Sequence, residues 1–312
     1  MIYYNPDSNI LNVLTYFILW VFIGEYVLEE PKFTQHPTEL FGYPYVIKDS
    51  VVQTIREKQY CPFLKGECKK PRKSQPEIKI GVCSVGYKDN FYEKIKPVII
   101  CPHRLEEPII YNSIKELYFG SLPDDYEIKW ASEVSCGVAG SIDFVAAKMK
   151  EDKIEDFLCV EFQAAGTTGT PWQAVLDFKQ TGSFQEKTYK YGINWANQYI
   201  KTMMQQVYKK GMVIESWGKK IVFVMQDVGL EYIQSNTDAQ DLHEVRDTDA
   251  IHFCTFRMIW NKGSEAWQLE FNKRVSTNIE GIRKILGGAH EDKFPSIDEF
   301  ENNINKRLNF SK

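Results

Sequence analysis

The chain has 312 residues, of which 43% are hydrophobic and 14% aromatic, and its formal net charge is −4. This composition excludes global disorder and suffices for one large domain or two modest ones. The slightly acidic balance argues against a protein that coats nucleic acid through its overall charge, although a local basic groove remains compatible with it.

Residues 1–34 form an N-terminal extension that contains an apolar run at residues 10–23. The run is shorter than the ~20 residues that a membrane-spanning helix needs. No Lys or Arg precedes it, so it lacks the charged start of a signal peptide. A core or interface helix is the favoured interpretation. A membrane anchor and an over-extended start of the chain are the alternatives.

Residues 35–125 are predicted to form a small metal-binding and DNA-contacting module around four cysteines: Cys61, Cys68, Cys83 and Cys101. No two of them have the CxxC spacing. Proline directly follows Cys61 and Cys101, and Gly81 precedes Cys83 by two residues, and such residues turn the backbone sharply. Four thiolates suit tetrahedral iron or zinc. The alternative is four unrelated buried thiols.

The other three cysteines are scattered through the rest of the chain: Cys136, Cys159 and Cys254. We expect them to be small core residues of a reduced protein, without a framework of disulfides. A nucleophilic cysteine is disfavoured, because no histidine is an evident partner for Cys159.

A basic segment at residues 65–73 carries four Lys and one Arg against a single acidic residue, Glu67. Basic side chains beside a metal-bound knot are suited to contacting phosphates. A solvated loop is the alternative, since runs of charge are commonly just that.

Residues 126–312 are predicted to form a larger, mixed α/β domain. We expect strands at 140–148 and 156–163, joined as a hairpin across a charged turn at 151–156. Residues 164–171 should form a glycine-containing loop. The unbroken apolar middle of 220–227 predicts a strand in the centre of the sheet.

Two helices are predicted in the same domain. In the first, at 194–211, Ala196, Ile200, Met203 and Val207 form an apolar stripe and Gly211 suits the C-terminal cap. In the second, at 294–308, Ser296 and Glu299 have the spacing of a capping box. The second helix also has an apolar face formed by Ile297, Phe300, Ile304 and Leu308.

The hairpin carries three polar residues of the kind that support metal chemistry. Side chains alternate along a strand, so Glu161 and Gln163 point to one side while Leu158, Val160 and Phe162 point to the other. Asp143 should meet Glu161 across the ladder. Two close carboxylates repel each other, and Mg²⁺ bound by hard oxygen ligands removes that repulsion. The alternative is that Asp143 ends its strand and Glu161 faces solvent.

Asp143, followed one strand later by Glu161-x-Gln163, resembles the signature of PD-(D/E)xK nucleases. That signature ends in Lys, so Gln163 departs from it. The stretches LFGYPYV, CPF…CKKPR, GVCSV and ICPHR, in this order, resemble the NotI-type restriction endonucleases. That family combines a four-cysteine iron-binding module with a PD-(D/E)xK domain whose third motif residue is Gln. The similarity runs from about Leu40 into the helix after the loop and is fainter towards the C-terminus.

The resemblance implies an α/β (α+β mixed) fold, with a restriction-endonuclease-like core and the small N-terminal four-cysteine module. By position, Cys61, Cys68, Cys83 and Cys101 would bind iron, with zinc as the alternative. Asp143 and Glu161 would bind catalytic Mg²⁺, and Gln163 would take the place of the lysine. Glu133 could add a further carboxylate, although an exposed structural glutamate is the commoner case.

The implied function is type II, site-specific and Mg²⁺-dependent cleavage of double-stranded DNA in restriction–modification defence. A homodimer on a palindromic site, a cognate DNA methyltransferase, a bacterial or archaeal cytoplasm and no small-molecule cofactor go with it. One alternative is a catalytically decayed protein that binds DNA or accompanies its repair. An iron redox protein is the other, although no flavin, nicotinamide or P-loop fingerprint is visible.

Overall fold

The computed structural model describes residues 36–88, 95–184, 189–287 and 295–309. The predictions for the N-terminal extension, including the apolar run at residues 10–23, lie outside these ranges. Within them, no helix is both long and apolar enough to cross a membrane.

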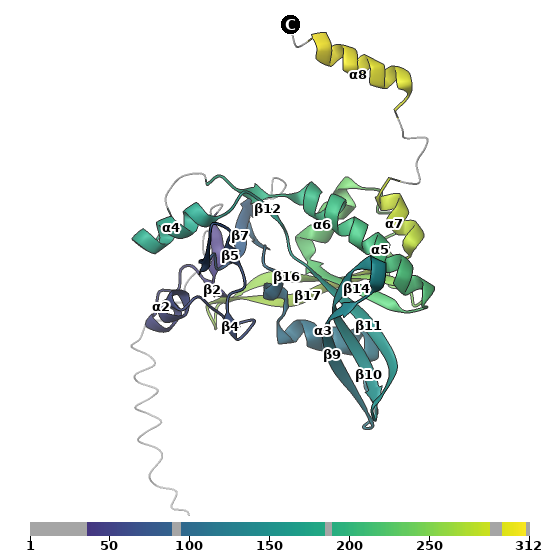
Figure 1. The fold of residues 1–312 in the computed structure, drawn as a ribbon, viewed down its shortest axis with the longest axis horizontal. Coiled ribbons are helices and arrows are strands. Elements are labelled where there is room, and N and C mark those ends of the chain that lie inside the picture. The colour runs from purple at the N-terminus through teal and green to yellow at the C-terminus, as the bar shows by residue number, and fades with distance from the viewer. Residues whose placement is uncertain (1–35, 89–94, 185–188, 288–294, 310–312) are drawn as a thin grey trace, which may run out of the picture.

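The centre of the protein is a seven-stranded mixed sheet in the order β15-β17-β16-β14-β11-β10-β9 (Figure 1). Its strands are β9 (Tyr126–Ser135), β10 (Ser141–Lys150), β11 (Lys153–Gln163), β14 (Lys220–Gln226), β15 (His243–Glu244), β16 (Ile251–Asn261) and β17 (Ala266–Thr277). Strands β11, β14 and β16 are mutually parallel, and the other neighbouring pairs are antiparallel. The predicted hairpin and the central position of 220–227 are therefore confirmed. The turn is shorter than predicted, because β11 already begins at Lys153.

Helices cover both faces of this sheet, which gives it two hydrophobic cores. Leu158, Val160 and Phe162 pack in one core beneath helix α3 (Pro108–Phe119). Cys159, from the opposite side of β11, belongs to the second core. That core is covered by α5 (Met204–Ser216), α6 (Asp227–Asn236) and α7 (Ile279–Ile285) (Figure 1). Because β11 is buried on both sides, any charged side chain on its inner half is held away from water.

The predicted helix at 194–211 exists, but its turns differ from the prediction. Ala196–Met203 is π-helical, and α5 continues to Ser216. The wider π turn shifts the apolar stripe. Tyr199 is therefore buried, whereas Ala196, which was predicted to lie on the stripe, is exposed. The assignment of Gly211 to the C-terminal cap is wrong. Gly211 lies inside α5, where an added Cβ would come within 2.6 Å of Ile251 Cδ1, so this glycine lets the helix approach β16 closely.

The N-terminal part builds a four-stranded sheet in the order β2-β1-β7-β8, with short hairpins and helices around it. Its strands are β1 (Pro37–Leu40), β2 (Tyr43–Pro44), β7 (Val82–Lys88) and β8 (Ile95–Ile99), and the hairpin strands are β3 (Tyr60–Cys61), β4 (Gly66–Glu67), β5 (Pro71–Arg72) and β6 (Gln75–Lys79). The remaining elements before and within the main sheet are α2 (Ser50–Glu57), the 3₁₀ helices Pro102–Leu105 and Gly137–Ala139, β12 (Thr167–Thr168), α4 (Trp172–Thr181) and β13 (Gly192–Ile193).

The two sheets are joined by buried polar contacts. The Gln226 amide accepts from Ile99 N at 2.8 Å and donates to Pro97 O at 2.7 Å. Arg104, which is 1% exposed and donates through Nε to Glu39 of β1, also donates through Nη2 to Trp267 O of β17 at 3.0 Å. All strands of the small sheet precede residue 125, yet its apolar residues share a core with the helices over the large one. The predicted domain boundary at 125/126 stays a prediction.

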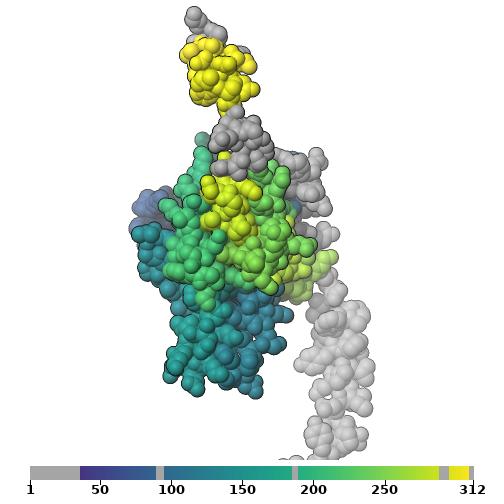
Figure 2. Space-filling view, turned by 90° about the vertical axis from the view of Figure 1, so that its right-hand side faces the viewer, coloured from purple at the N-terminus to yellow at the C-terminus, as the bar shows by residue number. Residues whose placement is uncertain are grey.

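Helix α8 (Ile297–Asn309) projects from the body (Figures 1 and 2). Its predicted capping box is confirmed, because Glu299 N donates to Ser296 Oγ and Ser296 N donates to Glu299 Oε2. The apolar face, however, is exposed, with Ile297 at 68% and Leu308 at 63%.

Candidate active site

Asp143 and Glu161 meet where the hairpin enters the sheet. The ladder between β10 and β11 pairs Phe144 with Val160, so the two acidic residues are the next to oppose each other. Asp143 N donates to Glu161 Oε1 at 3.2 Å, and Phe162 N donates to Asp143 Oδ2 at 2.9 Å. Glu161 is only 1% exposed. The alternative, in which Glu161 faces solvent, is therefore wrong.

Both carboxylates are held in a setting that disfavours their charge. Burial raises the pKa of Glu161 to about 7, the charge of Asp143 raises it too, and Lys210 opposes the rise. Burial also raises the pKa of Asp143, with smaller upward contributions from the charges of Glu133 and Glu106. Such perturbed neighbouring acids are typical of functional sites.

Lys210 contacts Glu161 from helix α5, and the sequence analysis did not predict this contact. Its Nζ lies 2.6 Å from Glu161 Oε1, and Lys210 as a whole is only 7% exposed. The signal was present: Met203, Val207, Lys210 and Ile214 follow helical spacing, and all four are buried. A lysine on the apolar stripe of a helix points its charge at the core.

Gln163 is the last residue of β11 and is 8% exposed. It lies two residues beyond Glu161, on the same side of the strand. Within the described part of the chain, its side-chain amide has no hydrogen bond to another protein group. The amide is thus free to bind water or a ligand oxygen, as an uncharged donor and acceptor.

Glu133 lies on the neighbouring strand β9, in an irregular part of the ladder. Ile142 pairs with Val134 and Phe144 with Ser132, and Glu133 between them has a φ of +53°. Its side chain is exposed. Its charge contributes to the raised pKa of Asp143, and its participation as a metal ligand stays a prediction.

The four N-terminal cysteines are all buried free thiols: Cys61, Cys68, Cys83 and Cys101. Burial raises the pKa of the Cys101 thiol, and the charges of Cys68 and Cys61 add to the rise. Cys101 in turn raises the pKa of Cys83, after burial and Glu39. The thiols therefore lie within electrostatic range of one another. In the residues that the structure describes, however, no three Cys, His, Asp or Glu side chains are close enough together to hold a metal ion.

The other three cysteines, Cys136, Cys159 and Cys254, are also free and buried. The prediction that these three are small core residues is confirmed, whereas the reduced state and the lack of a disulfide framework stay predictions.

The protein class of this chain follows from its match to a known family. The family model described as restriction endonuclease NotI matches residues 45–269, which is more than half of the chain. The chain belongs to the NotI restriction endonuclease family. No curated protein gives a significant match.

Membership in the NotI family makes the chain a DNA-cleaving hydrolase with a restriction-endonuclease-like fold, and the mixed α/β architecture agrees with it. It also implies that the protein binds DNA and uses a divalent metal. The match ends at residue 269, within β17, so helices α7 and α8 lie beyond it.

The acidic pair fits the divalent metal that the NotI family implies. One oxygen of each carboxylate accepts a backbone N–H from the opposite strand, namely Glu161 Oε1 and Asp143 Oδ2. The second oxygen of each receives no hydrogen bond from the described residues. Two hard oxygen donors with further positions left for water are the arrangement that Mg²⁺ prefers.

The cysteine group is chemically suited to a thiolate-bound metal, although it is not drawn together around one. Gly42 N donates to Cys83 Sγ at 3.3 Å, and backbone hydrogen bonds with Leu64 and Phe63 lower the pKa of Cys61 against the larger effect of burial. Donors of this kind stabilise a thiolate. Deprotonating buried thiols without a metal is costly.

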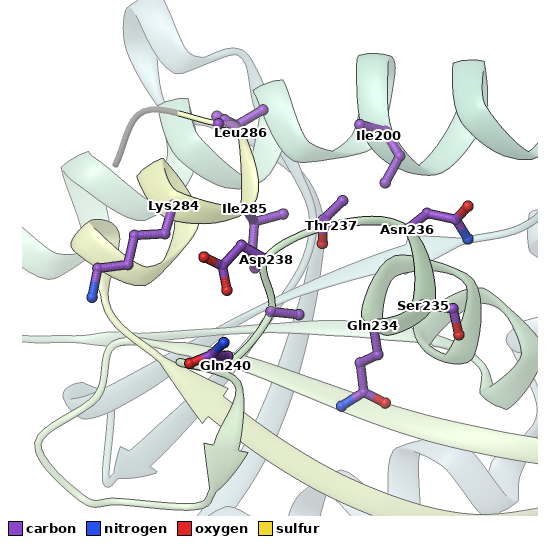
Figure 3. A pocket seen from close by; sticks show the side chains of 12 residues that line it. Ile200, Gln234, Ser235, Asn236, Thr237, Asp238, Gln240, Lys284, Ile285 and Leu286 are labelled. Atoms are coloured by element: carbon purple, nitrogen blue, oxygen red, sulfur yellow. The ribbon is translucent and has the colours of Figure 1, made fainter. Parts of the chain in front are cut away.

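A cavity of about 940 Å³ lies between the end of α6 and α7, lined by side chains such as Ser235, Asp238 and Lys284 (Figure 3). None of the predicted site residues of this NotI-family protein lines it. A second cleft, of about 690 Å³, lies between the basic segment and the loop that follows Gln163. Its lining includes Lys70, Arg72, Lys73, Thr167, Thr170 and Trp172.

Proposed function

We propose that the chain is a type II site-specific endonuclease that hydrolyses double-stranded DNA with Mg²⁺ at Asp143 and Glu161. The contact between these two acids, at the inner end of a hairpin, is the observation that carries the proposal. Two close buried carboxylates repel each other, and within the described residues Lys210 binds only Glu161, so a divalent cation at the remaining oxygens of the pair would remove the repulsion that is left.

The roles of the three motif residues follow from their chemistry. Asp143 and Glu161 each offer one carboxylate oxygen to the metal, while the other oxygen is fixed by the backbone. When bound, a divalent cation would activate a water and stabilise charge on the phosphate. The Gln163 amide holds that water or a phosphate oxygen, but it contributes no full charge. Hydrolysis breaks one P–O bond of the backbone and forms another with the water, without a covalent enzyme intermediate.

We propose that Cys61, Cys68, Cys83 and Cys101 bind a structural iron, with zinc as the alternative. The metal would organise the hairpins β3–β4 and β5–β6, which carry the basic segment at residues 65–73.

The basic segment offers DNA a path to the site. Lys73 is exposed and lines the cleft of about 690 Å³, and Lys69 of the same basic segment is exposed as well. The far wall of the cleft is the loop directly after Gln163. Phosphates bound by these lysines would therefore lie next to the end of β11.

Replacing Lys69 and Lys73 together by Glu should weaken DNA binding because two phosphate contacts are lost. The slope of log affinity against log salt should fall by about 1.8, at about 0.9 for each contact. Fluorescence anisotropy with a labelled duplex at several salt concentrations measures this. Lys153→Glu is the matched control, because this exposed lysine lies at the opposite end of β11, about 30 Å from Gln163. If the double variant and the Lys153→Glu control show the same salt dependence of DNA affinity, the basic segment does not contact phosphates.

Cleavage of both strands at a palindromic site is achieved most simply by a homodimer that presents one site to each strand. A cognate DNA methyltransferase would protect the host's own sites. Both expectations, together with action in the cytoplasm of a bacterium or archaeon, follow from the proposed restriction function.

Incubating the purified protein with plasmid and Mg²⁺, with EDTA as the control, tests the proposal. Discrete DNA fragments that appear only with Mg²⁺ are expected, and sequencing their ends should reveal one short sequence. Intact plasmid despite demonstrable DNA binding would instead favour a decayed nuclease that only binds DNA.

A further inference from the structure

Lys210 is the only buried lysine among the residues that the structure describes. Lysine is almost never fully buried without a partner, because its ammonium loses its hydration there. The partner here is Glu161, whose Oε1 lies 2.6 Å from the Lys210 Nζ.

The fold holds this ammonium firmly at the acidic pair. Val207 and Ile214, one turn before and one turn after Lys210, are both fully buried and anchor α5 on the sheet. The adjacent Gly211 lets the helix approach until an added Cβ would collide with Ile251. The backbone of Lys210 is therefore fixed, and its side chain has no path to solvent comparable to that of the exposed Lys209.

Stability alone does not explain a lysine at this position. An apolar side chain would pack on the same stripe without any desolvation cost, and replacing buried ion pairs by apolar residues is often neutral or stabilising. The charge instead lies beside the two acids that the proposed function needs and on the same side of β11 as Gln163, where the motif provides only a neutral amide.

We propose that Lys210 is a positioning residue that supplies, from helix α5, the positive charge that Gln163 lacks. The inference rests on the proposed endonuclease function. Lys210 fixes Oε1 of Glu161, which leaves Oε2 for the metal, and it places a cation beside the scissile phosphate's site. Gln163 and Lys210 would thus together perform the task that a single lysine performs in the PD-(D/E)xK signature.

Three variants test this proposal: Lys210→Met, Lys210→Arg and the control Lys209→Met. Lys210→Met should lower the single-turnover cleavage rate by about 100-fold or more, the scale for losing a preorganised electrostatic group. Affinity for the specific duplex, measured without metal, should change by only a few-fold. Lys210→Arg keeps the charge and should recover part of the rate, and Lys209→Met should cleave like wild type.

A binding measurement separates positioning from a merely structural role. Isothermal titration calorimetry with Mn²⁺ should show equal or tighter binding to Lys210→Met, because a positive charge next to Glu161 has been removed. A structural counter-ion would instead give weaker Mn²⁺ binding and a lower melting temperature together with the lost activity. Adding Gln163→Lys to Lys210→Met should restore the rate by about 10-fold or more, since the charge returns to the site.

The outcomes distinguish this inference from the proposed function. A wild-type enzyme that cleaves, together with a Lys210→Met variant that cleaves within a few-fold of it, would overturn the role of Lys210 alone. Parallel loss of Mn²⁺ binding, stability and cleavage in Lys210→Met, without recovery in Lys210→Arg, would also overturn it. A wild-type enzyme that leaves DNA intact in Mg²⁺ would overturn both.

Discussion

Asp143→Asn should abolish DNA cleavage, lowering the rate by about 1,000-fold or more, while the protein stays folded and still binds DNA. The amide cannot carry the negative charge that a divalent cation requires, and it removes one of the two carboxylates of the pair. The backbone bond from Phe162 N to Asp143 Oδ2 can be kept, because the Asn Oδ1 also accepts. Cleavage of plasmid and anisotropy with a labelled duplex measure the two properties.

The melting temperature of this variant adds an independent check. Burial raises the pKa of Asp143 in the folded chain. A group with a raised folded pKa imposes no cost below its unfolded pKa, and it lowers stability as the pH rises through the folded pKa. Metal-free Asp143→Asn should therefore melt at the same or a slightly higher temperature than wild type at neutral pH, and the difference should close in acid.

The matched control for this variant is Asp152→Asn, in the exposed turn between β10 and β11. It removes the same charge from the same hairpin and should cleave like wild type. Full activity of Asp143→Asn would refute the assignment of the acidic pair. A strong drop in its melting temperature would mean that Asp143 is structural.

Cys68→Ser should remove the structural metal and lower the melting temperature by about 10 °C. A serine hydroxyl is a poor ligand for iron or zinc, whereas its size suits the buried site of the thiol. Metal that binds only the folded chain contributes its binding free energy to folding, so losing it costs several kcal/mol. Elemental analysis and thermal unfolding measure the two effects.

Cys136→Ser is the control for that substitution, because Cys136 is also a buried thiol but lies outside the group of four. It should keep the metal and shift the melting temperature by only a few degrees. If Cys68→Ser behaves in the same way, with its metal content unchanged, the four-thiolate hypothesis is wrong.

Much of the large sheet could be predicted from local pattern. Strands β10, β11 and β14 follow from their apolar runs and the charged turn, and the central place of β14 follows from its unbroken apolar middle. Alternation along β11 then sufficed to bring Asp143 opposite Glu161. These features depend on residues that are close in sequence, so the pattern contains them.

The features that sequence reasoning missed depend on long-range packing. Lys210 reaches Glu161 only because α5 packs against the face of the large sheet, and this contact joins residues far apart in the chain. Gly211 resembles a helix cap locally, but it is a point of close approach to Ile251. The π turns before α5 shift the apolar stripe by an amount that a regular helical period cannot express.

The cysteines show a different limit of prediction from sequence. Their spacing suggested a metal, but spacing specifies neither the distances between the sulfurs nor the ion. The four thiols are buried and affect one another through their charges, but in the described residues they form no group that could hold a metal ion. The free energy of bringing them closer would come from the metal itself, which the sequence does not encode.

The most direct test of the central claim is anomalous diffraction from crystals of the enzyme soaked with Mn²⁺, under conditions in which Mn²⁺ supports cleavage in solution. We predict an anomalous peak bound by Asp143 and Glu161, at the inner end of the β10–β11 hairpin. A peak bound by other residues, with none at this pair, would contradict it.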